Sequence, residues 1–241
     1  MRGRVVEDVA DAIAFEIASG RLAPGESLPS IRRLAARYEI NPSTVQLVLG
    51  RLRTAGFVEP RQGVGVVVRD IQLVGGIETW RYVFRLSQGL PELTVSTVRD
   101  ALETLRIFYE TFHARIVAHP GKFDPGPARG ALRRLELLAA GERPAPGDVH
   151  RGVLAVLRAG LLAFGGGVTL AVLNSLGEML GEIPEVMTAL YADPAEHVWF
   201  WDQVITSWEN GDAELGRQAL DMLTDWHEVA LDRLRAGLAT P

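Results

Sequence analysis

Hydrophobic residues in the first part of the chain recur at helical spacing and are interrupted by turn signals. Apolar positions run from Val6 to Ile17, and Gly20 is a typical stop. A loop with a Pro-Gly turn follows, and Ser30 can cap a second helix over residues 30–38. The pattern predicts two helices joined by a loop.

A third helix is predicted from residue 41 onward. Asn41 is a good N-cap, and Pro42 occupies the first helical position, where its missing N–H does no harm. The apolar stripe expected to face a core consists of Val45, Val48, Leu49 and Leu52. The residues expected on the other faces are Ser43, Thr44, Gln46, Leu47 and Gly50.

Two β-rich pieces follow the third helix. The segments 57–60 and 65–68 flank a tip that contains Arg61, Gln62 and Gly63. Such pieces around a glycine-bearing turn predict a hairpin. Helices followed by a hairpin indicate a winged helix-turn-helix over residues 1–70.

The remainder of the chain shows helical patterns and no convincing strand. Residues 71–93, with Gly75 and Gly76, predict a linker helix, and residues 94–241 an all-α domain. Its helices are expected at 94–118, 127–140, 148–164, 168–181, 184–191, 194–210 and 212–237. The fold class is therefore mainly α, with an N-terminal winged domain and a C-terminal antiparallel helical bundle, because short connections make neighbouring helices pack side by side.

Composition narrows the classes of protein. The 241 residues, 47% of them hydrophobic, can bury two cores. No apolar run is long enough to span a bilayer, and the charged N-terminus is unlike a signal peptide, so we expect a soluble, cytoplasmic protein with no membrane partner. The absence of cysteine excludes disulfides, iron–sulfur clusters, thiolate zinc sites and a cysteine nucleophile.

Charge is unevenly distributed. Residues 1–70 have a net charge of +2, whereas the rest of the chain has −7. Any contact with nucleic acid is therefore expected in the N-terminal part. All basic residues except Lys122 are arginine, which suits bidentate contacts to phosphate and guanine, but a general richness in Ala, Gly and Arg is the simpler explanation.

The start of the third helix has the chemistry of a DNA contact. Its N–H groups and positive dipole end suit a phosphate, and its short polar side chains allow close approach to a groove. An ordinary amphipathic helix would look similar, but the following wing favours DNA binding. The predicted DNA-binding residues are Arg32, Asn41, Ser43, Thr44, Gln46, Arg61, Gln62 and Gly63.

The motifs APGESLPS, IRRLA and GRLRTAGFVEPRQGVGVVV, in this order, resemble the GntR family of bacterial transcription regulators. The resemblance covers residues 5–68 and implies that Arg32 and the first turn of the third helix contact an operator. Two positions that are often arginine in the family are Pro42 and Gln46 here, so the identity of the operator stays open.

The bundle resembles the effector domain of the fatty-acid-responsive, FadR-like subfamily over residues 102–235. This resemblance implies that Arg106 and Glu110, with Trp201 and Trp226, border an effector cavity. Arg106 and Glu110 are also spaced as a plain i,i+4 ion pair, and Trp201 shares a helix face with Trp208 in a way that is more typical of a core.

Many members of that subfamily hold a metal with one Asp and three His. The matching positions here are Val153, Leu157, Trp201 and Leu223, so no metal site and no cofactor are expected. A displaced site around His197 and His227 is the alternative.

Catalysis is not expected. The run Gly165–Gly167 has no following Lys and Ser or Thr, as a phosphate loop requires, and Lys122 is the only lysine available for a Schiff base. We therefore predict a homodimeric regulator that binds a palindromic double-stranded DNA operator and responds to a small-molecule effector such as a fatty acid or acyl-CoA. The alternatives are a constitutive repressor without effector and a metal- or organic-acid-responsive regulator.

Overall fold

A computed structural model describes residues 2–239 of the chain, which divides into two compact units, Met1–Gly89 and Leu90–Pro241. The fold is mainly helical with one two-stranded hairpin, as the sequence predicts. The first unit contains α1 (Arg2–Ala18), α2 (Ile31–Arg37), α3 (Pro42–Thr54), β1 (Val58–Arg61), β2 (Gly65–Val68), α4 (Ile71–Val74), α5 (Ile77–Leu86) and a 3-10 turn, η1 (Ser87–Gly89). The second contains α6 (Pro91–Ala118), α7 (Gly126–Ala139), α8 (Pro146–Ala163), α9 (Gly167–Leu180), α10 (Pro184–Leu190), α11 (Pro194–Asn210) and α12 (Ala213–Leu238).

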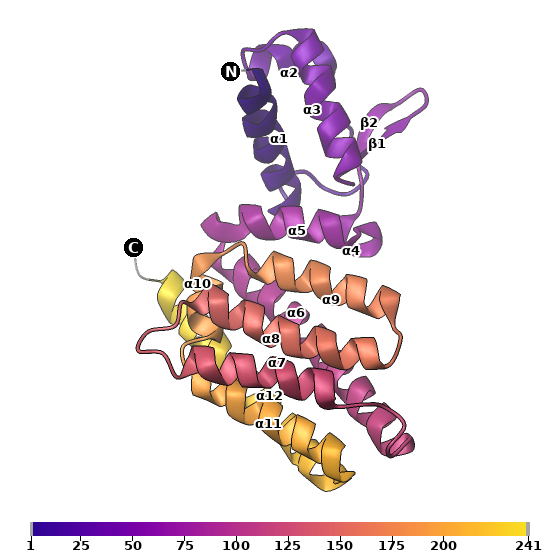
Figure 1. Ribbon diagram of the computed structural model, residues 1–241. Coiled ribbons are helices and arrows are strands. Elements are labelled where there is room, and N and C mark those ends of the chain that lie inside the picture. Colours follow the sequence, from indigo (N-terminus) through magenta and orange to yellow (C-terminus); the bar gives the residue numbers. More distant parts are fainter. Residues whose placement is uncertain (1, 240–241) are drawn as a thin grey trace. The chain divides into compact units, whose positions relative to one another are not determined.

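In the first unit, α3 packs against both α1 and α2 (Figure 1). The predicted caps are present: Ser30 Oγ accepts from Arg33 N, and Asn41 Oδ1 accepts from Thr44 N at 2.8 Å. Val45, Val48 and Leu52 are at most 1% exposed. The cap therefore fixes the start of α3, and the apolar stripe fixes which face points outward.

The wing is an antiparallel hairpin that extends beyond the end of α3 (Figure 1). Its register pairs Val58 with Val68 and Arg61 with Gly65. Gly63 at the tip has a φ of 76°, a left-handed conformation that glycine adopts without strain. Val58, Val67 and Val68 are buried, so the base of the wing belongs to the core and its tip is left exposed.

The segment predicted as a linker helix forms α4, α5 and η1 rather than one helix. A Cβ at Gly75 would lie 2.2 Å from the backbone O of Ile71, so the chain can break there only because this residue has no side chain. Tyr82 on α5 donates a hydrogen bond to Asp11 on α1, and its ring meets that of Phe57 edge-on at 5.2 Å. These contacts fasten α5 to the winged part of the first unit.

The second unit is a helical bundle in which α7, α8 and α9 lie side by side (Figure 1). Each of its seven helices lies within three residues of a predicted range. The core contains fully buried side chains from most of the helices: Leu132, Leu135, Leu173, Leu180, Ile183, Ile205 and Leu231.

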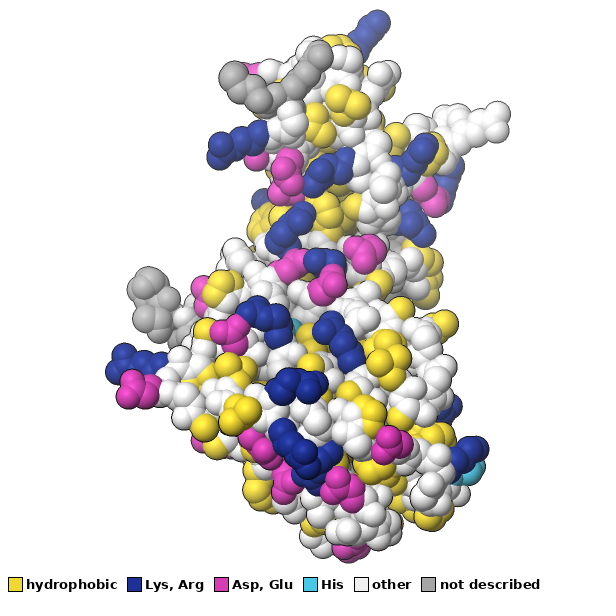
Figure 2. Space-filling view, in the orientation of Figure 1, with side chains coloured by type: hydrophobic (Ala, Val, Ile, Leu, Met, Phe, Trp, Pro, Cys, Tyr) yellow, Lys and Arg dark blue, Asp and Glu magenta, His cyan; other side chains and the backbone are white. Residues whose placement is uncertain are grey.

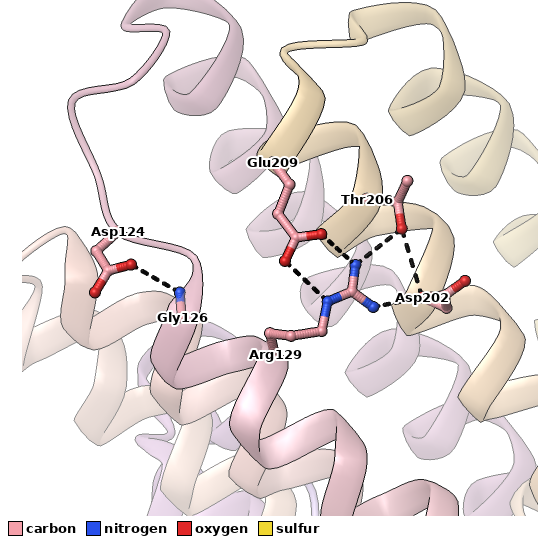
Figure 3. Close-up of polar contacts among 6 residues, drawn as sticks. All are labelled: Asp124, Gly126, Arg129, Asp202, Thr206 and Glu209. Carbon is pink, nitrogen blue, oxygen red and sulfur yellow. Dashed lines mark hydrogen bonds and ion pairs between the residues drawn. The ribbon is translucent and has the colours of Figure 1, made fainter.

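One arginine joins α7 to α11. Arg129 donates to Glu209 at 2.9 and 2.6 Å and to Thr206 at 2.9 Å, and it also pairs with Asp202 (Figure 3). The side chain of Arg129 is only 18% exposed. Hydrogen bonds to two carboxylates raise the pKa of Arg129. The guanidinium therefore clamps two helices that are far apart in the sequence.

Among residues 2–239, no helix combines the length and the apolar character that a membrane span requires.

Candidate functional site: a nucleic-acid interface and a buried cavity

Over residues 43–50 the outward face of α3 carries no charge and is polar apart from Leu47, and the exposed Arg53 follows one turn after Gly50. Ser43, Gln46, Leu47 and Gly50 are all exposed there. The opposite face of the helix is buried in the core, so the core does not require the side chains of this outward face. Such a face can approach the edges of bases closely.

The first turn of α3 is organised by Asn41. Its Oδ1 accepts from Thr44 N at 2.8 Å, from Ser43 Oγ at 2.7 Å and from Thr44 Oγ1 at 2.8 Å. The amide oxygen is thus fully used inside the protein, and only the amide N–H₂ group of Asn41 is left to donate outward.

Thr44 is not on the outward face as predicted. Thr44 is only 4% exposed, and its hydroxyl donates to Asn41 Oδ1 at 2.8 Å. The expected outward placement of Thr44 is therefore wrong. Thr44 instead holds the N-cap residue Asn41 in place through the hydrogen bond from its hydroxyl.

The other predicted DNA-contacting residues lie on the surface of the first unit. Arg32 on α2 is exposed and has no ion-pair partner among residues 2–239. On the wing, Arg61 pairs with Glu59 at 3.0 Å, while Gln62 and Gly63 are exposed at the tip. Arg61 must exchange this carboxylate for a phosphate if it binds DNA.

Positive charge on the first unit is dispersed. The face seen in Figure 2 shows arginine side chains interspersed with Asp and Glu. Several arginines are already paired, including Arg37 with Glu16 and Arg51 with Glu7. On the face shown, the described arginines therefore do not form a broad basic patch that would bind nucleic acid by charge alone.

The second unit encloses a cavity of about 60 Å³ between α6, α8, α11 and α12 and their neighbours. Its walls are mainly apolar and include Leu105, Leu154, Phe200, Trp201 and Trp226. Two of the predicted effector residues, Trp201 and Trp226, therefore line it. Its polar lining residues are Tyr109, His150, Tyr191, Glu196, His197, His227 and Arg233.

Two of the cavity histidines are held by hydrogen bonds. His150 lies 2.8 Å from Gly177 O through Nε2 and 2.7 Å from Tyr191 Oη through Nδ1. A carbonyl only accepts, so Nε2 carries the proton and Nδ1 accepts from the tyrosine. His197 likewise donates from Nε2 to Leu190 O at 2.9 Å.

Burial keeps these imidazoles neutral. It lowers the pKa of His150 and of His197, and it lowers the pKa of His227 to about 4 with the help of nearby His197 and Arg106. Burial also raises the pKa of Tyr109 and Tyr191. Near pH 7 the histidines and tyrosines of the lining are therefore neutral donors and acceptors, and the charged lining residues are Glu196 and Arg233.

Arg233 is the cation that the cavity offers to a ligand. It makes no ion pair with any residue in the part of the chain from 2 to 239, and it also lines an outer groove beside Pro184 and Glu185. The residues predicted to bind an effector do not include Arg233 or His150. The position of His150 within the apolar sequence of α8 is the feature that could have indicated a buried polar site.

Arg106 and Glu110 do not line this cavity. Arg106 pairs with Glu110 and, at 2.7 Å, with Glu103, and it borders an outer groove of about 210 Å³. The arrangement is the i,i+4 ion pair that the sequence left as an alternative. Leu102 and His227 line both the cavity and the groove beside Arg106.

The four positions at which the resemblance places metal ligands all meet at the cavity. Val153, Leu157, Trp201 and Leu223 line it together, and none can ligate a metal. Residues 2–239 contain no group of three or more His, Asp or Glu arranged to hold a metal ion. The lining therefore does not fit the metal that the resemblance implies.

Residues 5–68 match the family of bacterial regulatory proteins named gntR. The match begins in α1 and ends with β2, so it contains the helix-turn-helix and the wing. Residues 5–68 therefore form a winged helix-turn-helix that is similar to the gntR family.

Curated relatives are similar over the same part. The chain is 41% identical over 103 residues to the HTH-type transcriptional regulator Mce2R of Mycobacterium tuberculosis (strain CDC 1551 / Oshkosh), which covers 42% of this chain and 41% of Mce2R. It is 44% identical over 69 residues to the uncharacterized HTH-type transcriptional regulator Rv0494 of M. tuberculosis (strain H37Rv), 29% of this chain and 28% of that protein. The matches thus span less than half of these relatives. Both relatives are named as HTH-type transcriptional regulators.

A solved structure has a similar fold. Lar, which controls the expression of the Listeria monocytogenes agr system, aligns with a TM-score of 0.51 at 14% identity, over 93% of this chain and 95% of that chain. A likeness at this identity establishes the shared fold. The assignment of the bundle to the FadR-like subfamily stays a prediction.

Proposed function

We propose that this chain, whose residues 5–68 are similar to the gntR family, is a cytoplasmic, homodimeric transcription regulator that binds operator DNA and responds to a small molecule in the bundle. The observation that carries the proposal is the outward face of α3. Over residues 43–50 this face is uncharged and mainly polar, its helix is capped by Asn41, and it lies in the same unit as a wing with an exposed tip.

In this proposal, α3 enters the major groove. Gln46 has the amide that pairs with N6 and N7 of adenine, and Ser43 and Asn41 sit at the helix end that favours phosphate. Arg32 and the wing residues Arg61, Gln62 and Gly63 contact the backbone or the minor groove. Thr44 contributes by holding Asn41 in place, not by contact.

A dimer compensates for the weak charge of one winged unit. Residues 1–70 have a net charge of only +2, and part of that charge is tied up in ion pairs. Two linked half-site contacts bind far more tightly than one. A palindromic operator, with half-sites about one helical turn apart or a multiple of it, would match the two-fold symmetry of such a dimer.

For the effector we propose a short carboxylic acid with a compact apolar body. Arg233 supplies the charge for a carboxylate, neutral imidazoles and tyrosines supply hydrogen bonds, and Trp201 and Trp226 supply an apolar wall. A cavity of about 60 Å³ holds only a few heavy atoms. A long fatty acyl chain, as in the FadR-like prediction, requires the lining side chains to move.

DNA binding is tested by a mobility shift with the upstream region of the protein's own gene. We expect a complex at low salt and a steep loss of affinity as salt increases, because arginine–phosphate contacts release counterions. The absence of a complex at low salt contradicts the proposal. Analytical ultracentrifugation of the free protein tests the dimer.

The effector is tested by thermal unfolding with a series of carboxylates from acetate to octanoate, and with oleoyl-CoA. We expect the transition temperature to increase most for short members, and Arg233→Gln to abolish that increase. Stabilisation by oleoyl-CoA alone supports a fatty acyl effector instead. No stabilisation by any compound, together with DNA binding, supports a constitutive repressor.

A further inference from the structure

We propose that Leu47 and Gly50 of α3 read a thymine in the operator, with the Leu47 side chain packed on the C5 methyl group of the base and Gly50 allowing the helix to approach. The inference rests on the proposed DNA binding and adds a specificity-determining pair to it. It concerns two residues outside the predicted DNA-binding set.

Leu47 is a large apolar residue whose side chain is not packed in the core of the unit. It is 57% exposed, whereas the stripe on the other side of α3, Val45, Val48 and Leu52, is at most 1% exposed. A single exposed leucine is common on protein surfaces, so exposure alone decides nothing. The environment of Leu47 on the helix carries the argument.

Gly50 lies one turn after Leu47, in the interior of α3. Glycine in a helix interior costs about 1 kcal/mol relative to alanine. A Cβ at Gly50 would meet nothing within 4 Å, and Gly50 does not need a positive φ. Nothing inside the unit therefore requires a glycine here, whereas a surface that approaches α3 closely does.

The rest of the face shows what kind of surface approaches. Ser43 and Gln46 are exposed beside Leu47 and Gly50, and none of the four carries a charge. The neutral stretch from Ser43 to Gly50 suits base edges, whereas the charge that a phosphate favours is found one turn later, at the exposed Arg53. The thymine methyl is the one apolar group that a base edge presents in the major groove.

A protein partner fits this face less well. One leucine beside a glycine is far smaller than the apolar patches of a few hundred Å² that mark protein interfaces. The polar neighbours and the Asn41 cap at the start of the same helix match the end-on approach of a recognition helix to DNA. With Gln46 facing an adenine, the base pairs that both residues read are expected to be A·T pairs, in either orientation.

The test uses the full-length protein and a duplex selected by it from a random library. Each thymine of the selected half-site is replaced in turn by deoxyuridine, which pairs identically but lacks the methyl group. We expect one position at which binding weakens about fourfold per half-site, which corresponds to about 0.8 kcal/mol for one buried methyl-sized group. The affinity of Leu47→Ala should not respond to uracil at that position.

Matched variants separate reading from folding. Leu47→Met should keep the sensitivity to uracil, and Leu73→Ala, at a residue of α4 that is 80% exposed, should bind like the wild type. Gly50→Ala should weaken binding at least about fivefold, comparable to a mismatched base pair, while its thermal unfolding temperature stays equal or increases. Gly237→Ala, at another open helical position, should leave binding unchanged.

The outcomes distinguish this inference from the proposed function. If the wild type selects no sequence, the DNA-binding proposal fails, and this inference fails with it. If the wild type binds but no thymine responds to uracil, or if Leu47→Ala responds like the wild type, the inference is overturned and the regulator stands. Tight binding by Gly50→Ala would overturn the close-approach argument.

Discussion

The two units present their chemistry in opposite ways. In the first, the candidate contact residues lie on the outside of α3, α2 and the wing, and a single capped helix carries most of them. In the second, the candidate ligand groups are buried and come from several helices, with His150 on α8, His197 on α11 and His227 on α12. The first site is local in the sequence, and the second exists only after packing.

Because of this difference, substitutions in the two sites should affect the stability of the protein differently. The exposed candidate DNA-contacting residues Gln46 and Arg32 have no packing role in the core, so substitutions there should change DNA binding and leave folding intact. Buried imidazoles and the Arg129 clamp are part of the bundle's interior, so substitutions there should change folding first. The following predictions test that contrast, from the largest expected effect to the smallest.

Acid should destabilise the second unit. The pKa of His227 is about 4 in the folded protein, against an ordinary 6.5, so the unfolded chain binds the proton more readily between these values. Stability is therefore complete above about pH 6.5 and decreases toward pH 4, by about 1.4 kcal/mol per pH unit for each such histidine. His150 and His197 act in the same direction.

Urea unfolding followed by tryptophan fluorescence at about pH 7 and about pH 5 measures this effect. Four of the five tryptophans lie in the second unit, so the signal reports mainly on the bundle. His227→Leu should lose less stability on acidification than the wild type. His119→Asn, at an exposed histidine outside the cavity, should behave like the wild type, and equal stability at both pH values would contradict the prediction.

Replacing Arg129 with Ala should destabilise the bundle by about 2–4 kcal/mol, because it leaves Asp202 and Glu209 without their shared cation in a partly buried place. The midpoint of urea unfolding measures the loss. Arg217→Ala, which breaks exposed pairs with Glu214 and Asp221, is the control and should change the midpoint little. A similar midpoint for both variants would show that Arg129 is no clamp.

Arg32→Ala should weaken operator binding by roughly 1–3 kcal/mol without altering the unfolding midpoint, if Arg32 contacts a base or a phosphate. Fluorescence anisotropy with labelled operator measures the affinity, and its salt dependence should flatten if the lost contact is a phosphate. An unchanged affinity would remove Arg32 from the interface. Arg235→Ala, on α12 of the second unit, serves as the control.

Thr44→Val should have the smallest effect of these substitutions. Although Thr44 lies in the helix proposed to contact DNA, its replacement should not change the DNA sequence preference. The variant loses the hydrogen bond to Asn41 and should cost about 0.5–1.5 kcal/mol of stability. Because the Thr44 side chain is buried, DNA sequence preference should be unaltered when it is measured on folded protein. A changed preference in library selection would place Thr44 at the DNA.

The sequence anticipates features that depend on neighbouring residues. The Asn41–Pro42 start of α3, the hairpin and the seven bundle helices are encoded by caps, glycines and apolar periodicity within short segments. Thr44 was misplaced because helical spacing sets a residue near the edge of the core stripe, and the hydrogen bond to Asn41 decides its direction.

The cavity could be anticipated only in part. Trp201 and Trp226 were expected there, but Arg106 and Glu110 instead pair with each other on the surface of the same helix. The meeting of His150, Tyr191 and His197 depends on how α8 and the helices that follow it pack, which no local spacing encodes. Arg233 is recognised only once its surroundings show no carboxylate paired with it among residues 2–239.

The separation of the two faces of α3 has an evolutionary consequence. The buried stripe and the Asn41 cap hold the helix in place, while Ser43, Gln46, Leu47 and Gly50 contribute nothing that the unit needs in order to fold. A duplicated gene could therefore acquire a new operator by single substitutions at these four positions without first gaining extra stability. Descendants of one ancestor could diverge in their targets while their winged units remain interchangeable in structure.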